Sequence, residues 1–474
     1  MNYTPEKHVG STGDVPDCFM IPHGLQDFYS MGTIEETDTS GRMMYAFHGD
    51  LMPSPTHYCE KCGTTMHVNN TFATQLRHLP FGGALTYVRF TRKQYYCPAC
   101  GKTNMEEVPF RAEHHRITKV LETYIEELLA RGYRNKEITV LTGVDQKAVK
   151  EIDLERLRRE YTEGREGAEE GTCPKLKRPK EYSRFLIIDE FKLHDNYKYA
   201  THIIDGQTGH ILWIDHGKSK QVIYNFIEHV GEEWMSHVEA VACDMNSDFQ
   251  EAFEDRCEWI QPVFDHFHII KNFNDNVVSA VRKDEQKRLA ESGDKEGAAA
   301  LKKTKYILTS RRDTLQKKDK EAESGKVISA GSGLFHQPEV VRHGGYEDKY
   351  DELLKSNKLL FTLDLVKEQL TAAYAETSEY VMAEIIDNII EVCRATENPH
   401  FIWFANLLTN HYEGIIAHAT YNISTGKIEG INNKIKTLRR WAFGYPDDEY
   451  FFLKVIDSSY KPYVRNLKSH KFFH

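Results

Sequence analysis

Three features are missing from this 474-residue sequence, and each absence narrows the class of protein. No run of about 18 apolar residues is present, so no segment can cross a membrane as a helix. The first residues, MNYTPEKHVGSTGDVPDC, have no basic stretch followed by an apolar one. No secretory signal is therefore evident, and we expect a cytoplasmic protein. Basic residues are not in excess either, because the formal net charge is −10.

The negative charge weakens a nucleic-acid function without excluding it. Salt screens charges beyond roughly 8–10 Å, so binding depends on local patches. Residues 301–320, LKKTKYILTSRRDTLQKKDK, hold eight Lys or Arg against two Asp. A hydrophobic content of 40% with 28% charged residues is typical of a folded protein, and the length suggests two to four domains.

Nine cysteines are present, and four of them occur in two similar motifs, YCEKCG at 58–63 and YCPACG at 96–101. The two-residue spacing lets both sulfurs of a pair reach one ion, and the glycine after each pair permits the turn. We therefore predict a structural Zn²⁺ site, since four thiolates leave no open coordination position. Incidental buried thiols or a redox pair are the alternatives. The predicted ligands are Cys59, Cys62, Cys97 and Cys100.

The segment NKEITVLTGVDQKAVKEIDLERL, at 135–157, is typical of a helix-turn-helix. Gly143 provides the turn and Asp145 can cap the second helix. The start of that helix is where such motifs meet base edges, which makes Gln146, Lys147 and Lys150 candidate DNA contacts. A helical hairpin that binds nothing has the same pattern.

A strand-rich block follows, with apolar strands expected at 184–191, 197–205, 210–217 and 238–246 and a helix at 219–234. Three antiparallel strands, a helix and a further strand describe a ribonuclease-H-like core, in which the first strand lies beside the fourth. The first and fourth strands end in Asp189 and Asp244. Adjacent carboxylates repel unless a cation lies between them, and hard oxygen ligands suit Mg²⁺ or Mn²⁺. Asp205 and Asp215 also end strands and are interpreted as turn residues.

A third carboxylate would complete a site for two ions, and Glu429 in KIEGINNKIKTLRRW (427–441) is the candidate. An acid in the first turn of a helix can also simply complement the helix dipole. The basic residues that follow it would neutralise approaching DNA, and Trp441 could stack on a base or belong to the core. The candidate DNA contacts on this helix are Lys434, Lys436, Arg439, Arg440 and Trp441.

The segments IIDEF, ACDMN, FDHFHIIK and IEGINNKIKTLRRWAFGY resemble the DDE transposases of bacterial insertion sequences of the ISL-three family. The likeness covers most of the chain beyond residue 50. It implies that Asp189, Asp244 and Glu429 are the catalytic triad. Asp265 and His268 match an Asp-x-x-His motif of related transposases and would organise the site, although a buried, hydrogen-bonded His is an equal alternative.

The resemblance implies a multidomain α/β protein in which a four-cysteine zinc ribbon and a helix-turn-helix precede a ribonuclease-H-like core interrupted by an all-α insertion. The expected segments are a lead-in at 1–50, the zinc domain at 51–110, the helix-turn-helix at 111–162, a linker at 163–180, the core at 181–280 and 405–474, and the insertion at 281–404.

The expected function is a transposase that binds the terminal inverted repeats of its element, in bacterial cytoplasm or on the nucleoid. It would cleave and join strands with two Mg²⁺ ions, as a homodimer or larger assembly on double-stranded DNA. A nuclease or resolvase without strand transfer and an inactive DNA-binding regulator are the alternatives. A tyrosine recombinase using Tyr412 or Tyr421 is disfavoured, because no Arg/His cluster can be assembled for it.

Overall fold

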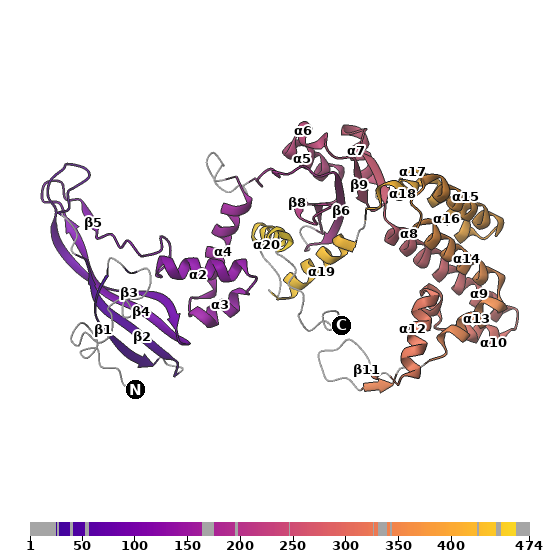
Figure 1. Cartoon of the computed structure of the whole chain (residues 1–474), viewed down its shortest axis with the longest axis horizontal. Coiled ribbons are helices and arrows are strands. Elements are labelled where there is room, and N and C mark those ends of the chain that lie inside the picture. The colour runs from indigo at the N-terminus through magenta and orange to yellow at the C-terminus, as the bar shows by residue number, and fades with distance from the viewer. Residues whose placement is uncertain are drawn as a thin grey trace. The chain divides into compact units, whose positions relative to one another are not determined.

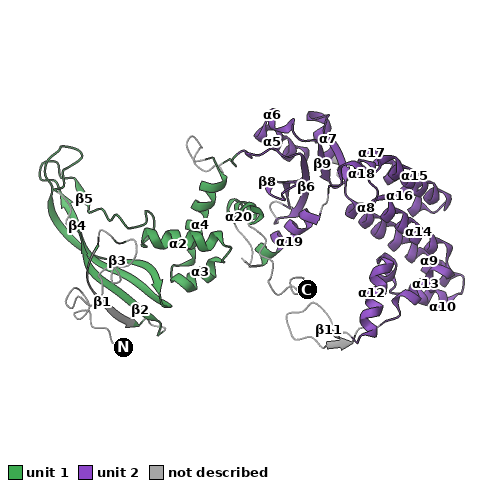
Figure 2. Cartoon of the chain, viewed as in Figure 1, with its two compact units in different colours: residues 1–177, 437–474 green, residues 178–436 purple. Residues whose placement is uncertain are grey.

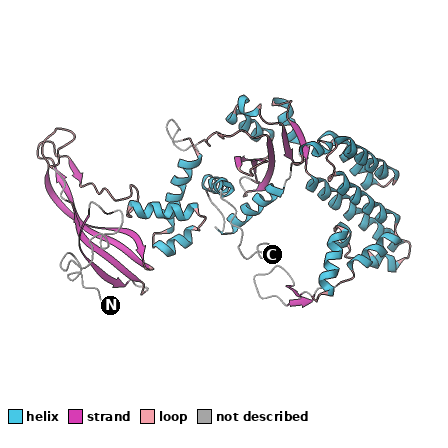
Figure 3. Ribbon diagram, viewed as in Figure 1, coloured by secondary structure: helices cyan, strands magenta, loops and turns pink. Residues whose placement is uncertain are grey.

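The computed structural model of the chain forms two compact units, residues 1–177 with 437–474 and residues 178–436 (Figure 2). Figure 1 labels the helices and strands, and Figure 3 colours them by type. The residues that the structure describes are 25, 28–37, 41–52, 56–163, 175–194, 198–245, 247–325, 327–329, 339–341, 344–423, 426–441 and 447–460.

The first unit contains a five-stranded sheet with the order β1-β2-β4-β3, and β5 also pairs with β4. The parallel pair is β2 with β4, and the other pairs are antiparallel. Buried side chains such as Phe28, Val88 and Phe90 form the core of one face. The strands are β1 (Phe28–Thr37), β2 (Met43–Leu51), β3 (His67–Phe81), β4 (Ala84–Tyr96) and β5 (Thr103–Met105).

The expectation of a loosely ordered lead-in at 1–50 was wrong for its second half. Residues 28–37 and 43–51 are strands of this sheet. Ala46 is buried in β2, and Phe47 packs against the core, but the polar residues around them hide the alternation of a strand. Only pairing with β4, which is more than thirty residues away in the chain, makes the role of this segment visible.

Helices α2 (Lys119–Ala130), α3 (Asn135–Thr142) and α4 (Gln146–Tyr161) follow the sheet. The predicted turn and cap are confirmed. Gly143 has φ of +69°, which favours glycine, and the Asp145 carboxylate accepts the backbone N–H groups of Lys147 and Ala148.

The C-terminal helix α20 (Asp448–Tyr460) packs against α4, so residues 437–474 belong to the first unit. This differs from the expected boundary, which placed all of 405–474 with the core. A buried ion-pair network explains the packing: Arg156 of α4 contacts Asp153 at 2.9 Å and Asp457 of α20 at 3.1 Å, and Lys454 of α20 contacts Asp153 at 2.8 Å.

The second unit is built around a five-stranded mixed sheet with the order β10-β9-β6-β7-β8. As expected, the first strand of the block lies beside the fourth: β6 runs parallel to β9 and antiparallel to β7. Helices α5, α6 and α7 connect these strands. The bounds are β6 (Phe185–Lys192), β7 (Tyr199–Asp205), β8 (Ile211–His216), α5 (Lys220–Val230), α6 (Glu232–Met235), β9 (Ala240–Cys243), α7 (Ser247–Arg256) and β10 (Gln261–Phe264).

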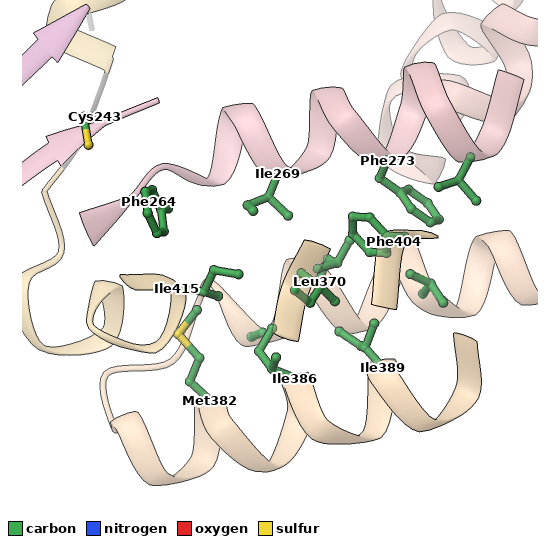
Figure 4. Packing of buried hydrophobic residues seen from close by; sticks show 14 of the residues in the cluster. Cys243, Phe264, Ile269, Phe273, Leu370, Met382, Ile386, Ile389, Phe404 and Ile415 are labelled. Atoms are coloured by element: carbon green, nitrogen blue, oxygen red, sulfur yellow. The ribbon is translucent and has the colours of Figure 1, made fainter. Parts of the chain in front are cut away.

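A helical region follows β10 and shares one hydrophobic core with the sheet. Figure 4 shows its packing, in which the Phe273 and Phe404 rings lie 4.9 Å apart. Its helices are α8 (His266–Asn272), π-helix η2 (Phe273–Val278), α9 (Ser279–Glu291), α10 (Lys295–Ala300), α11 (Lys305–Thr309), α12 (Arg312–Glu323), α13 (Tyr346–Ser356), α14 (Lys358–Ala373), α15 (Glu379–Ala395), α16 (Pro399–Asn410), α17 (Tyr412–Ile416), α18 (His418–Tyr421) and α19 (Gly426–Trp441).

The expected insertion at 281–404 is not entirely helical. Strands β11 (Val327–Ser329) and β12 (Glu339–Val341) form a short antiparallel pair within it. Part of the Gly/Ser-rich stretch between and around these strands lies outside the described residues. The insertion is also not a separate body, because its buried residues belong to the same cluster as those of β6 and β9.

Candidate functional site

The four predicted zinc ligands converge at one end of the first sheet. The Sγ atoms of Cys59 and Cys100 are 3.4 Å apart, those of Cys62 and Cys97 are 3.5 Å apart, and all four lie within 4.8 Å of one another. Four thiols at this spacing fit one tetrahedral zinc ion. The glycine after each cysteine pair, Gly63 and Gly101, adopts the positive φ that the turn of the knuckle requires.

Hydrogen bonding shifts the thiol pKa values of this centre in both directions. The Thr64 hydroxyl lies 3.4 Å from Cys62 Sγ, and hydrogen bonds with Thr64 and Cys97 together lower the pKa of Cys62 to about 6. The backbone of Lys102 lowers the pKa of Cys100, but the Cys59 thiol and burial outweigh it and raise that pKa to about 11. Metal binding needs the deprotonated thiol, so Cys62 is ready to bind a cation at neutral pH.

The carboxylates of Asp189 and Asp244 are positioned by two neighbouring strands. In the parallel pair β6–β9, Ile187 is opposite Ala242, and each aspartate follows two residues later. This register places the two aspartates side by side at one edge of the sheet, where β9 ends at Cys243, although β6 continues for three residues beyond Asp189 to Lys192. Each aspartate accepts the backbone N–H of the next residue, at 2.8 Å for Asp189 and 2.7 Å for Asp244.

Asp244 forms an ion pair with His268 in the first helix after β10. His268 Nδ1 lies 2.8 Å from Asp244 Oδ1. Burial disfavours the charged carboxylate, but His268, the backbone N–H of Met245 and Lys271 together outweigh burial, and the pKa of Asp244 is lowered. Burial likewise opposes the imidazolium, but Asp244, Asp189 and Asp265 together outweigh it, and the pKa of His268 is raised. His268 thus keeps Asp244 ionised.

Negative charge accumulates at this edge. Burial raises the pKa of Glu190, and the neighbouring charges of Asp189 and Asp244 raise it further. Across the sheet from Asp189 lies His202 on β7, whose ring is fully buried. Burial lowers the pKa of His202 to about 4 even though Asp189 opposes this shift, so the imidazole beside Asp189 is neutral. This edge of the sheet therefore favours a bound cation over a bound anion.

Helix α19 contacts the sheet through two side chains. Asn432 Nδ2 donates to Asp189 Oδ2 at 2.6 Å at this edge, whereas Lys427 Nζ donates to the backbone oxygen of Gly206 at 2.7 Å in the turn after β7, beside the start of β6. Ile428, Ile431 and Ile435 are buried. Glu429, an exposed residue, lies one helical turn before Asn432.

In the described part of the chain, the four cysteines, whose Sγ atoms lie within 4.8 Å of one another, form the one group of three or more side chains close enough to hold a metal ion together. The carboxylates of Asp189, Asp244 and Glu429 lie on neighbouring elements but do not form such a group. Asn432 was missed by the sequence reasoning. Asn432 follows Glu429 by three residues, and this spacing places the two side chains on the same face of a helix.

Asp265 is buried at the start of α8. Its charge acts on His268 and also on His266, Tyr374 and His418. The expectation that Asp205 is a turn residue is supported, since its carboxylate accepts the N–H of Thr208 at 2.8 Å.

The candidate DNA contacts of α4 divide into two kinds. Gln146 and Lys147 are exposed, and Lys147 lies 3.8 Å from Glu151. Lys150 instead forms a 3.0 Å ion pair with Asp447 and lies over the Tyr450 ring. Lys150 thus contributes to the packing of α20.

The basic residues of α19 flank its buried face. Lys436 and Arg440 are exposed, whereas Lys434 and Arg439 are partly buried. Glu429, Lys436 and Arg440 are spaced by seven and four residues, so they lie on one stripe of the helix. The side chain of Trp441 lies outside the described residues.

Among the residues that the structure describes, no helix combines the length and the apolar character needed to cross a membrane.

Comparisons with known proteins agree with this organisation. A transposase model of the ISL3 group matches residues 186–455, and a model described as the zinc-finger of transposase IS204/IS1001/IS1096/IS1165 matches residues 55–100. The second match contains the four cysteines.

Two named relatives match over long segments. The transposase for insertion sequence element IS1001 of Bordetella parapertussis is 25% identical over 429 residues, which cover 90% of this chain and 94% of the relative. The transposase for IS1557 of Mycobacterium tuberculosis is 23% identical over 264 residues, 55% of this chain and 57% of the relative. Because the first family model covers more than half of the chain, this protein belongs to the ISL3, or ISL-three, family of transposases.

Proposed function

We propose that this protein is a DDE-type DNA transposase. It binds the terminal inverted repeats of its own insertion sequence, cleaves strands at the ends and joins the freed 3′ hydroxyls to target DNA. The observation that carries the proposal is the meeting of Asp189, Asp244 and helix α19 at one sheet edge, where Asn432 donates to Asp189.

The arrangement of the second unit supports a ribonuclease-H-like core. Its sheet order, with β6 between antiparallel β7 and parallel β9, is the order expected for that fold. The catalytic residues in this proposal are Asp189, Asp244 and Glu429. Asp189 and Asp244 precede most of the helical region in the sequence, and Glu429 lies near its end. The helices between them account for the 185 positions that separate Glu429 from Asp244.

The same three residues would hold two Mg²⁺ or Mn²⁺ ions. The accumulated negative charge that raises the pKa of Glu190 fits a cation site. When bound, the ions would stabilise charge on the attacked phosphate and on the leaving oxygen. His268 keeps the Asp244 carboxylate ionised, and Asn432 orients the Asp189 carboxylate.

DNA recognition is assigned to two helices. Helices α3 and α4 act as a helix-turn-helix, with exposed Gln146 and Lys147 at the start of α4 near the bases. On α19, the basic residues after Glu429 neutralise phosphates near the acidic site. Two ends must be processed together, so we propose a dimer or larger assembly on DNA.

The test uses the purified full-length protein, a labelled duplex that carries the gene's flanking ends, and a supercoiled plasmid. Wild type, Asp189→Asn and Glu429→Gln are compared with Mg²⁺ and with EDTA. We expect nicked ends and joined products only when wild type is incubated with Mg²⁺, and neither product with EDTA or with either variant. Cleavage by Glu429→Gln at the wild-type rate would refute the assignment of the third acid.

Two other outcomes would replace the proposal. Metal-dependent cleavage without joined products would identify a nuclease or resolvase. Specific binding to the ends without cleavage in either Mg²⁺ or Mn²⁺ would identify a regulator that has lost catalysis.

A further inference from the structure

The two longest strands of the zinc-bearing sheet contain no acidic residue. The sequence from His67 to Tyr96 spans β3, its hairpin turn and β4, and it contains Arg77, Arg89 and Lys93 among its basic residues but neither Asp nor Glu. Over the whole chain acids outnumber Lys and Arg, with 71 Asp and Glu against 61. An acid-free stretch of this length is therefore unusual for this protein.

The pairing of the two strands separates an inner face from an outer face. Side chains alternate along a strand, and directly paired residues lie on the same face. Leu76 pairs with Val88, and both are buried in the core. Thr74 with Phe90 shares this inner face, and the alternate pairs point outward. We call these outward pairs the ribbon face, which consists of Thr71 with Lys93, Ala73 with Thr91, and Gln75 with Arg89.

The ribbon face is open and polar. Thr71, Ala73 and Thr91 are among its exposed residues, and Arg89 Nε donates to Gln75 Oε1 at 2.7 Å. The nearby carboxylate of Glu106 is buried, so it is not part of this exposed face, and it accepts the backbone N–H of Lys93 at 2.9 Å.

The ribbon face continues onto the turn between α3 and α4. Arg77, the next outward residue of β3, lies over the Tyr87 ring at 4.5 Å. Its guanidinium also occupies the place next to Gly143, where an added Cβ would lie 2.2 Å from Arg77 Nη1. Helices α2 and α3 pack against β3, as Figure 1 shows. The exposed Gln146 and Lys147 follow this turn directly.

We propose that the ribbon face and the first turn of α4 form one continuous surface that binds duplex DNA. Arg89 and Lys93 contact phosphates, while Gln75 and the threonines offer hydrogen bonds to base edges. A two-stranded ribbon fits the major groove, and the small Ala73 and Thr91 allow the backbone to approach it. This surface rests on the proposed function, since it extends end recognition from the helices to the zinc-bearing sheet.

The test measures the affinity of the full-length protein for a labelled duplex with the gene's flanking ends, over a range of salt concentrations. The double variant Arg89→Gln/Lys93→Gln removes two phosphate contacts. Each contact contributes about 0.9 to the slope of log K against log salt, so the slope should fall by about 1.8, and affinity at about 0.15 M salt should fall about 30-fold.

Lys102→Gln is the matched control. Lys102 belongs to the same zinc-bearing region but pairs with Glu60 at 2.7 Å, and its loss should leave the slope unchanged. Zinc content verifies that each variant is folded. Thr91→Glu provides a second variant, because it keeps both cations and places a carboxylate at the centre of the ribbon face. It should weaken binding at least as much as the double variant.

The outcomes separate this inference from the proposed function. If the double variant and Thr91→Glu both bind with the slope and affinity of Lys102→Gln, the ribbon face does not bind DNA, and the transposase proposal stands. If wild type fails to bind the duplex at any salt concentration, the proposed function fails as well.

Discussion

The buried ion-pair network between α4 and α20 gives the sharpest test of how the first unit is held together. The Asp153 side chain is fully buried and accepts hydrogen bonds from Arg156, Tyr450 and Lys454, the last at 2.8 Å. Asp153→Asn keeps the shape but removes one negative charge. Lys454 then loses its carboxylate partner, whereas Arg156 keeps Asp457 at 3.1 Å.

Removing one partner of a buried charge network costs about 3–5 kcal/mol, because the remaining charge is left uncompensated. That free energy corresponds to roughly 150- to 5,000-fold faster hydrogen exchange when opening is local. The effect should be confined to peptides from α4 and α20. Hydrogen exchange is preferred to a single unfolding midpoint, since a protein with two compact units does not unfold in one two-state step.

Two variants check the reasoning. Lys147→Ala removes an exposed ion pair on the same helix and should change the opening free energy by less than about 0.5 kcal/mol. Asp153→Asn/Lys454→Met removes one charge of each sign and should recover most of the lost protection. If α20 exchanges no faster in Asp153→Asn than in Lys147→Ala, the network does not attach α20 to α4.

Three further changes test the other sites. Asn432→Ala should lower strand cleavage about 10- to 100-fold, because Asp189 loses its hydrogen bond, and cleavage at the wild-type rate would show that this bond does not matter. Cys62→Ser should remove stoichiometric zinc by elemental analysis, and retention of one ion per chain would exclude it as a ligand. Gly143→Ala should destabilise the α3–α4 turn by at least about 1–2 kcal/mol, because φ is +69° and a Cβ would meet Arg77. Hydrogen exchange of α3 should therefore be faster in this variant, and unchanged exchange would contradict the reasoning.

Local chemistry was readable in the sequence. The Cys-x-x-Cys-Gly motifs predicted the four zinc ligands and the turn at each glycine, because each knuckle is a contact among near neighbours. The sheet then brings the two knuckles together, although Cys59 and Cys100 are 41 positions apart in the sequence. The Asp145 cap was predictable for the same reason. The adjacency of β6 and β9 followed from element order, and the apolar residues before Asp189 and Asp244 marked the two strands, although β6 continues past Asp189 to Lys192.

The tertiary structure decided what depends on contacts between distant segments. Residues 43–51 form a strand because β4 supplies a partner, and residues 28–37 pair with that strand in turn. Helix α20 joins the first unit because Asp153 and Asp457, about three hundred positions apart, share Arg156. The hydrogen bond between Asn432 and Asp189 likewise crosses 243 positions. A single side chain that meets a distant partner leaves no periodic pattern in its own neighbourhood. The sequence by itself therefore determined which residues carry charge, sulfur and turns, while folding decided which of them meet.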